Sequence, residues 1–206
     1  MAERQFLEPA MRQRATEIVK QIESHTSVEV VVSVRRASSR YLRASIRAGA
    51  AVALVAALVM VLSPTAYTTW LIPVDAALAG VLAGFVVTQW PALKRRCLSS
   101  SERMQGVAAE AAASFHRLNI AATREHTGLL VFVSLFERQV LLRPDSGINV
   151  DLLGPEYESA RDALQTALQN YDAERFLLAL ASLAAPLASV HPRRPDDINE
   201  LSDEVD

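Results

Sequence analysis

Two long apolar runs, separated by a short break, occupy the chain between Ile46 and Trp90. A bilayer core about 30 Å thick needs about 20 helical residues, because each helical residue rises about 1.5 Å. Residues 44–62 and 71–93 both reach this length, and Asp75 is the one acidic residue within them. Asp75 follows Pro73, so it belongs in the first turn of its helix, near the water boundary. The sequence therefore predicts a transmembrane hairpin over residues 44–93.

Basic residues flank both runs, whereas the turn between Ser63 and Ile72 carries no charge. The first run is preceded or entered by Arg35, Arg36, Arg40, Arg43 and Arg47, and the second is followed by Lys94, Arg95 and Arg96. Short loops rich in lysine and arginine stay on the cytoplasmic side. We therefore expect a protein of the inner (plasma) membrane, with two spans and both termini in the cytoplasm. The lipid bilayer is its first expected partner.

Small residues recur every four positions in both runs. They are Gly49, Ala53 and Ala57 in the first run, and Ala76, Gly80 and Gly84 in the second. Such spacing lets helix backbones approach closely. It is compatible with pairing inside the hairpin and with self-association of two copies, and other membrane proteins are a further class of partner.

The composition excludes several other classes of protein. A formal net charge of −2 argues against a nucleic-acid partner, and the basic clusters follow from membrane topology. The single cysteine, Cys97, excludes an intramolecular disulfide and a multi-cysteine metal site. The four histidines lack the spacing of a zinc motif. The residues outside the hairpin are enough for one domain of ordinary size.

Periodicity predicts an α/β fold in which a mixed β-sheet is flanked by helices. The predicted elements are an amphipathic helix over 6–24, a buried strand over 28–34, the hairpin, a helix capped by Ser99–Ser101, strands over 129–135 and 139–145, a short edge strand over 148–152, a helix opened by Pro155 and a last helix capped by Asp172. Residues 1–43 and 94–186 thus form one domain interrupted by the hairpin. The acidic, proline-bearing segment 187–206 is predicted to be a disordered tail.

Three motifs in this order resemble those of the TPM-domain family. The first strand carries Thr26, Ser27 and Glu29 before its valines. The second motif begins at Thr123 and continues with Thr127, Gly128, Leu129 and Leu130. It is followed by the Glu137-Arg138 turn and then by Asp145, Gly147 and Ile148. The family includes thylakoid-lumen proteins linked to photosystem II repair and many bacterial membrane proteins.

The resemblance implies a TPM-like α/β sandwich and a phosphatase-like activity. Such an activity needs a hard cation or another group that stabilises phosphoryl oxygens. Glu29, Asp145 and Asp151 could hold calcium or magnesium, with Arg143 or Arg124 pairing with phosphate. The matching motif residues are Thr26, Thr127, Gly128 and Gly147. Soluble members carry Gly-x-Gly-x-Glu where this chain has Asp145 to Asn149.

Each candidate residue also has an ordinary structural interpretation. Asp145, Ser146 and Gly147 are typical turn residues, and Glu137 with Arg138 is typical of a hairpin tip. Two functions therefore follow from the sequence. One is a membrane-anchored module for interaction, assembly or quality control at the inner face of the membrane. The other is a metal-assisted phosphatase-like hydrolase with carboxylates near Asp145.

Overall fold

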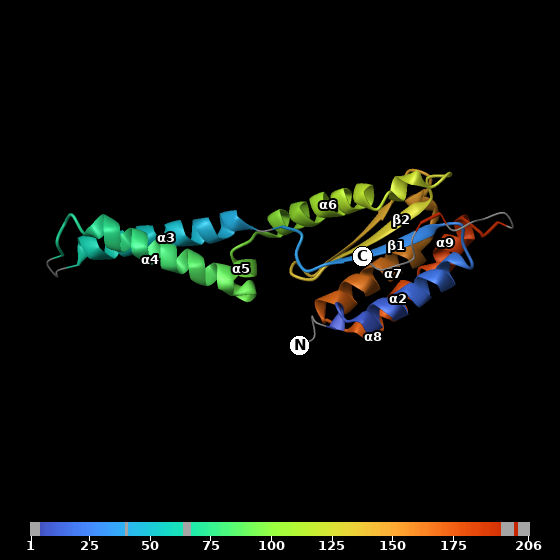
Figure 1. Cartoon of the computed structure of the whole chain (residues 1–206), viewed down its shortest axis with the longest axis horizontal. Coiled ribbons are helices and arrows are strands. Elements are labelled where there is room, and N and C mark those ends of the chain that lie inside the picture. Colours follow the sequence, from blue (N-terminus) through green and yellow to red (C-terminus); the bar gives the residue numbers. More distant parts are fainter. Residues whose placement is uncertain (1–4, 40, 64–66, 195–199, 202–206) are drawn as a thin grey trace. The chain divides into compact units, whose positions relative to one another are not determined.

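The computed structural model describes residues 5–39, 41–63, 67–194 and 200–201. The chain divides into two compact units. One contains Met1–Ser38 together with Met104–Asp206, and the other is Ser39–Arg103. The first unit holds the whole β-sheet, and the second holds the two apolar helices (Figure 1).

A three-stranded mixed sheet forms the centre of the first unit, as the sequence predicts. Its strands are β1 (Glu29–Arg35), β2 (Gly128–Ser134) and β3 (Gln139–Pro144), in the spatial order β1-β2-β3. The central strand β2 pairs with β1 in parallel and with β3 in antiparallel orientation. The two parallel strands are separated in the sequence by the entire second unit.

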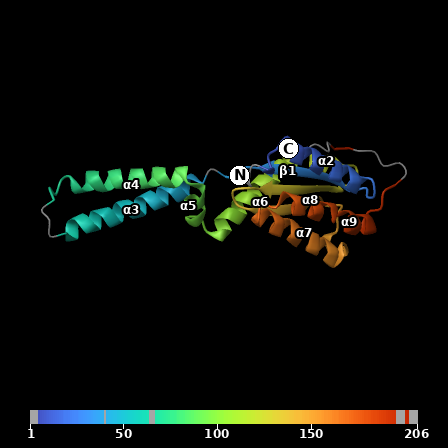
Figure 2. The ribbon, with the colours of Figure 1, turned by 90° about the horizontal axis from the view of Figure 1, so that it is seen from below.

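Helices cover both faces of this sheet, which explains why β1 and β2 read as almost continuous apolar runs. Figure 1 and Figure 2 show α2 (Pro9–Glu23), α7 (Gly154–Gln169), α8 (Ala173–Ala181) and α9 (Ala184–Val190) on one face, and α6 (Ser100–Arg117) on the other. Alternate residues of a strand point to opposite faces. Val30 therefore packs in the large cluster under α2, α7 and α8, while Val31 packs against α6.

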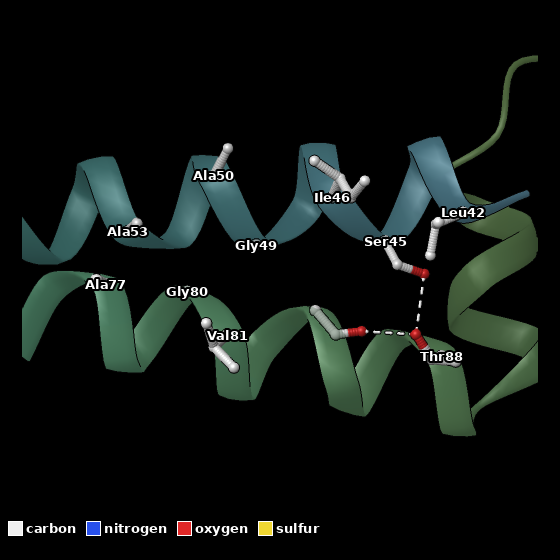
Figure 3. Close-up of a pocket in the computed structure, with 11 residues that line it drawn as sticks. Leu42, Ser45, Ile46, Gly49, Ala50, Ala53, Ala77, Gly80, Val81 and Thr88 are labelled. Atoms are coloured by element: carbon white, nitrogen blue, oxygen red, sulfur yellow. Dashed lines mark hydrogen bonds between the residues drawn. The ribbon is translucent and has the colours of Figure 1, made fainter.

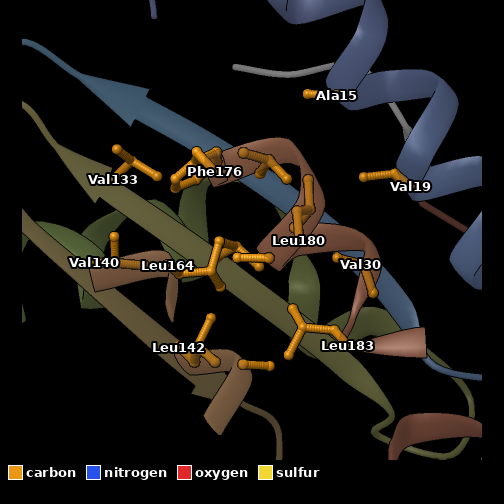
Figure 4. Close-up of a cluster of buried hydrophobic side chains, with 14 of the residues drawn as sticks. Ala15, Val19, Val30, Val133, Val140, Leu142, Leu164, Phe176, Leu180 and Leu183 are labelled. Atoms are coloured by element: carbon orange, nitrogen blue, oxygen red, sulfur yellow. The ribbon is translucent and has the colours of Figure 1, made fainter. Parts of the chain in front are cut away.

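The larger cluster is the main core of the first unit. Figure 4 shows side chains from strands and helices meeting in it, among them Val133, Leu142, Leu164, Phe176 and Leu180. All five are buried, and Leu164 and Leu180 are fully inaccessible to solvent. The smaller cluster on the other face is built around Phe115, Ile120 and Phe132.

Local signals fix where the helices begin. Ser99 Oγ accepts a hydrogen bond from the backbone N–H of Glu102 at 3.2 Å, and Glu102 Oε2 accepts one from Ser99 N at 3.0 Å. This reciprocal pair is a capping box for α6. Asp172 Oδ1 accepts from Arg175 N at 3.0 Å and caps α8. The predicted caps are confirmed at both positions.

The second unit contains α3 (Leu42–Leu62), α4 (Ile72–Gln89) and the short α5 (Pro91–Arg96). Asp75 lies in the first turn of α4, as expected. The prediction of one helix over 71–93 is wrong, because α4 ends at Gln89. Trp90 has an extended backbone (φ −109°, ψ 101°), which is the conformation that the following Pro91 imposes on its neighbour.

Two further predictions fail in the second half of the chain. Residues 148–152 contain a 3₁₀ turn, η2 (Val150–Leu152), in place of a strand. The tail does not begin at residue 187, because α9 continues to Val190 and Leu187 is fully buried in the core. Beyond it, Pro192 forms a β-bridge with Thr26. Residues 195–199 and 202–206 of the predicted tail lie outside the described residues.

Candidate functional site

Exposed apolar surface is concentrated on α3, α4 and their connection. Among the described residues, all but three of the exposed large hydrophobic side chains lie between Leu42 and Trp90, and the exceptions are Met104, Leu152 and Leu178. Soluble proteins rarely expose a continuous apolar surface of this kind. Both helices, over Ala44–Leu62 and Ile72–Gln89, are long and apolar enough to cross a membrane.

A third segment, Ala173–Val190, also meets the length and hydropathy requirement for a span. It is more deeply packed than the other two segments. Of this segment 39% is buried, compared with 11% of Ala44–Leu62 and 17% of Ile72–Gln89. Phe176, Leu180 and Leu183 of this segment lie in the main core of the sheet unit. The segment is also broken into α8 and α9.

The small residues of α3 and α4 bring the two helices of the hairpin together. A Cβ atom on Gly49 would lie 2.6 Å from the carbonyl oxygen of Gly80, and a Cβ on Gly80 would lie 2.7 Å from that of Gly49. Neither position can hold a larger residue without moving a backbone. The close approach that the spacing predicts thus occurs inside the hairpin, with Ala53 packed against Gly80.

An apolar groove of about 430 Å³ runs along one side of this helix pair (Figure 3). Gly49, Ala50 and Ala53 line it from α3, and Ala77, Gly80 and Gly84 line it from α4. Two hydroxyls lie at one end. Thr88 Oγ1 donates to Ser45 Oγ at 3.1 Å and also lies 2.9 Å from the carbonyl oxygen of Gly84.

The end of the hairpin that carries Ser45 and Thr88 is also its basic end. Arg47 forms an ion pair with Glu102 at 2.7 Å, and its side chain is 56% exposed. Lys94, Arg95 and Arg96 occupy the last turn of α5. Asp75 lies at the opposite end of α4.

Two of the predicted site residues, Glu29 and Asp145, lie at one edge of the sheet. Glu29 is paired in register with Gly128, and the backbone N–H of Asp145 donates to the Gly128 carbonyl oxygen at 2.8 Å. Gly128 separates them and is itself tightly enclosed, since a Cβ there would lie 2.4 Å from Ile120 Cγ2. Glu29 is only 6% exposed, so it is a buried carboxylate.

Asp145 interacts with the side chain of His126. His126 Nδ1 lies 3.2 Å from Asp145 Oδ2, with the imidazole 57% exposed and the carboxylate 12% exposed. The other oxygen of Asp145 accepts from Ser146 N at 2.7 Å. The N–H of Gly147 donates to the His126 carbonyl oxygen at 2.9 Å and closes the turn.

The motif threonines have structural hydrogen bonds. Thr26 Oγ1 donates to the His191 carbonyl oxygen at 2.6 Å and accepts from Val28 N at 3.2 Å. The backbone carbonyl of Thr127 accepts from Glu29 N at 3.2 Å. Both side chains are buried. Thr26 through its hydroxyl and Thr127 through its backbone carbonyl hold the start of β1 in place.

Arg143, Asp151 and Arg124 each have different neighbours, and Arg124 forms an ion pair with Glu200 at 3.2 Å. Arg143 stacks its guanidinium over the Phe115 ring, 5.3 Å from the centroid. Asp151 is exposed in η2, where its N–H donates to Asn149 Oδ1. Within the part of the chain that the structure describes, no three His, Cys, Asp or Glu side chains gather as a metal-binding group. Glu29, Asp145 and Asp151 are thus not brought together as one such group.

A buried polar cluster at the opposite edge of the sheet was missed by sequence reasoning. Glu137 is 2% exposed, and its two carboxylate oxygens accept from Ser134 Oγ and, at 3.0 Å, from Ser38 N. Ser38 Oγ donates to Ser134 Oγ at 2.8 Å. The signal in the sequence is Ser134 itself, a polar residue at the end of an otherwise apolar strand.

A second, more polar pocket of about 490 Å³ lies between α2 and the start of α8. Arg14 and Glu174 form a bidentate ion pair on its wall. The hydrogen bond from Arg14 lowers the pKa of Glu174, and the same bond raises the pKa of Arg14. Both side chains are more than half exposed, so this pair is an exposed surface contact.

Comparison with known proteins identifies a structural relative. The chain is similar to the NMR structure of BA42 protein from the psychrophilic bacterium Bizionia argentinensis, with a TM-score of 0.56 and 16% identity, over 96% of this chain and 92% of the other. At this identity the similarity concerns the fold alone. No protein-family model and no curated protein matches the sequence.

Proposed function

We propose that this chain is a TPM-like domain anchored in the inner membrane by the α3–α4 hairpin, and that it serves as an interaction module for assembly or quality control of membrane proteins. The observation that carries the proposal is the concentration of exposed large apolar side chains, among the described residues, between Leu42 and Trp90. Covering this surface with lipid removes it from water, as the hydrophobic effect requires.

In this proposal the membrane is crossed twice. α3 and α4 expose most of their large side chains, whereas α8 and α9 bury most of theirs in the sheet unit. Basic residues at the Ser45 and Thr88 end of the hairpin, and none in its connecting turn, support a topology with both termini in the cytoplasm. The role in assembly or quality control draws on the resemblance to a family that includes proteins linked to photosystem II repair.

Topology is tested with reporters in the full chain. A reporter active only in the cytoplasm is fused after Asp206 in one version and inserted after Thr69 in another. We expect activity from the first fusion and none from the second, with the protein resisting extraction by alkaline carbonate. Activity of the Thr69 insertion, or release of the protein at alkaline pH, would contradict the two-span anchor.

The interaction role is tested by chemical crosslinking in intact membranes, followed by purification of the full chain in mild detergent. The proposal expects crosslinked membrane proteins that depend on the sheet unit. A version carrying Leu180→Asp, which places a charge in the core, serves as the control with an intact anchor but a disrupted domain. Identical crosslinking patterns for the two proteins would count against an interaction role of the domain.

A second candidate function, a metal-assisted phosphatase-like hydrolase, draws on the Asp145 and His126 pair. Here an exposed imidazole sits against a carboxylate, next to the buried Glu29 across Gly128. An imidazole oriented by a carboxylate is a usual proton donor or acceptor. The test is hydrolysis of a panel of phosphate esters with magnesium or calcium, comparing Asp145→Asn with the exposed control Asp151→Asn. If both variants retain the hydrolytic activity, Asp145 is excluded as a residue of the active site.

A further inference from the structure

We propose that the groove between α3 and α4 holds one acyl chain of an anionic phospholipid from the leaflet at the basic end of the hairpin. The inference rests on the proposed function, since it requires the hairpin to span the bilayer. The groove, the small residues that create it and the charges at its mouth all belong to the Ser39–Arg103 unit.

The length of the groove favours a lipid chain over a partner helix. Its lining extends from Leu42 to Ala53 on α3 and from Thr88 to Ala77 on α4. At about 1.5 Å per residue, each stretch covers roughly 16 Å. This is about half of a hydrocarbon core of about 30 Å, which is the depth of one leaflet. A partner helix would cross both leaflets and would need a groove along the whole of α3.

The lining of the groove suits a flexible hydrocarbon chain. Its walls are glycine and alanine, with Ile46 and Val81 at the rim, both more than 60% exposed. The polar groups at its end are already paired, because Thr88 donates to Ser45 and Ser45 is 4% exposed. A hydrocarbon chain can therefore fill the groove without leaving either hydroxyl unsatisfied. Filling it restores the dispersion contacts that small side chains leave unmade.

The charge distribution selects an anionic headgroup. The lining of the groove reaches Leu42, Ser45 and Thr88 at one end of the hairpin. The same end carries Arg47 and, on α5, Lys94, Arg95 and Arg96. Between Ser39 and Arg103 the only acidic residues are Asp75, at the far end of α4, and Glu102, which pairs with Arg47. Basic pockets between membrane helices on the cytoplasmic side bind anionic headgroups in this way.

The experiment is native mass spectrometry of the full chain in detergent, titrated with dioleoyl phosphatidylglycerol or dioleoyl phosphatidylcholine. We expect one tightly bound phosphatidylglycerol, with a preference of roughly tenfold over phosphatidylcholine. The variant Ala50→Phe fills the groove and should reduce this binding by about tenfold or more. Ala51→Phe is the matched control, because Ala51 is an exposed neighbour on the same helix that does not line the groove. A triple change of Lys94, Arg95 and Arg96 to glutamine should remove the preference between the two lipids.

Three results would overturn the proposal. Equal binding of the two lipids by the unaltered protein excludes a charge-selective site. Equal loss in Ala50→Phe and Ala51→Phe, or loss in neither, places the lipid elsewhere. If the protein forms a dimer that is lost in Ala50→Phe and kept in Ala51→Phe, a second copy of the chain occupies the groove. The reporters at Thr69 and Asp206 separate these results from failure of the anchor, because they test insertion independently of bound lipid.

Discussion

At the scale of single residues, the most consequential group is Glu137. Its carboxylate is buried and accepts from Ser134 Oγ and Ser38 N. Replacing Glu137 with alanine leaves both donors without their acceptor, which should lower the free energy of unfolding by about 2–4 kcal/mol. Pulse proteolysis of the detergent-solubilised chain across a urea series measures this change. The control Glu17→Ala, at an exposed position, should change the free energy of unfolding by less than about 0.5 kcal/mol. Equal changes in the Glu137 and Glu17 variants would show that the buried cluster does not stabilise the fold.

Tyr157 provides a prediction about pH. Burial raises its pKa to about 12, with a smaller contribution from Glu158, while Arg161 acts in the opposite direction. Because the folded-state pKa lies above the ordinary value of about 10, this tyrosine contributes stability that is complete below pH 10 and is lost as the pH rises toward 12. The difference in absorbance at 295 nm between the unaltered chain and Tyr157→Phe should show no ionisation of this residue near pH 10 while the chain is folded. A native transition at pH 10 would mean that the phenol is exposed.

The turn at Asp145 and the buried Glu137 show which features of a site can be predicted from the sequence and which cannot. The Asp145-Ser146-Gly147 turn is local, and its chemistry is readable from adjacent residues. Glu137 has the sequence of an ordinary hairpin tip, and its burial arises from Ser38, far away along the chain. Likewise, the carboxylate–imidazole contact of Asp145 depends on how the start of β2 lies beside the end of β3. Contacts between residues that are far apart in the chain produce no periodic pattern in the sequence.

At the scale of elements, α8 separates core packing from membrane insertion. Leu180 and Leu178 lie two residues apart, yet Leu180 is fully buried in the sheet unit and Leu178 is 71% exposed. Leu180→Ala should therefore lower the free energy of unfolding by about 2–5 kcal/mol, through lost burial and a cavity. Leu178→Ala should change it by less than about 0.5 kcal/mol. The same urea and proteolysis series measures both, and similar costs at the two positions would contradict the placement of α8 on the sheet.

Most elements were predictable because their signals lie within a few residues. Alternating and continuous apolar patterns located β1, β2 and β3, and caps located the starts of α6 and α8. The errors have physical causes. Pro91 ends α4 at Gln89, four residues before the predicted end of the helix at residue 93. The helix α9 extends past Pro186 because Leu187 completes the core, and burial outweighs the composition of the following tail.

At the scale of the whole molecule, the hairpin lies in the sequence between β1 and β2, and these two strands pair with each other in the sheet. Both hydrophobic clusters of the sheet unit are built only from residues outside Ser39–Arg103. The sheet unit should therefore retain its fold when residues 39–103 are replaced by a flexible Gly/Ser linker of about 12 residues. A shorter connection also costs less loop-closure entropy.

This replacement separates the two roles of the chain. We expect the shortened protein to be soluble without detergent and to unfold in urea in a single cooperative transition, as a domain with its own core does. The same shortened protein carrying Leu180→Asp should lose that transition, because the charge would be buried without a partner. Circular dichroism and size-exclusion chromatography measure both properties. If the shortened protein aggregates, or unfolds without cooperativity, α3 and α4 are part of what holds β1 against β2, and the hairpin is a structural component of the domain.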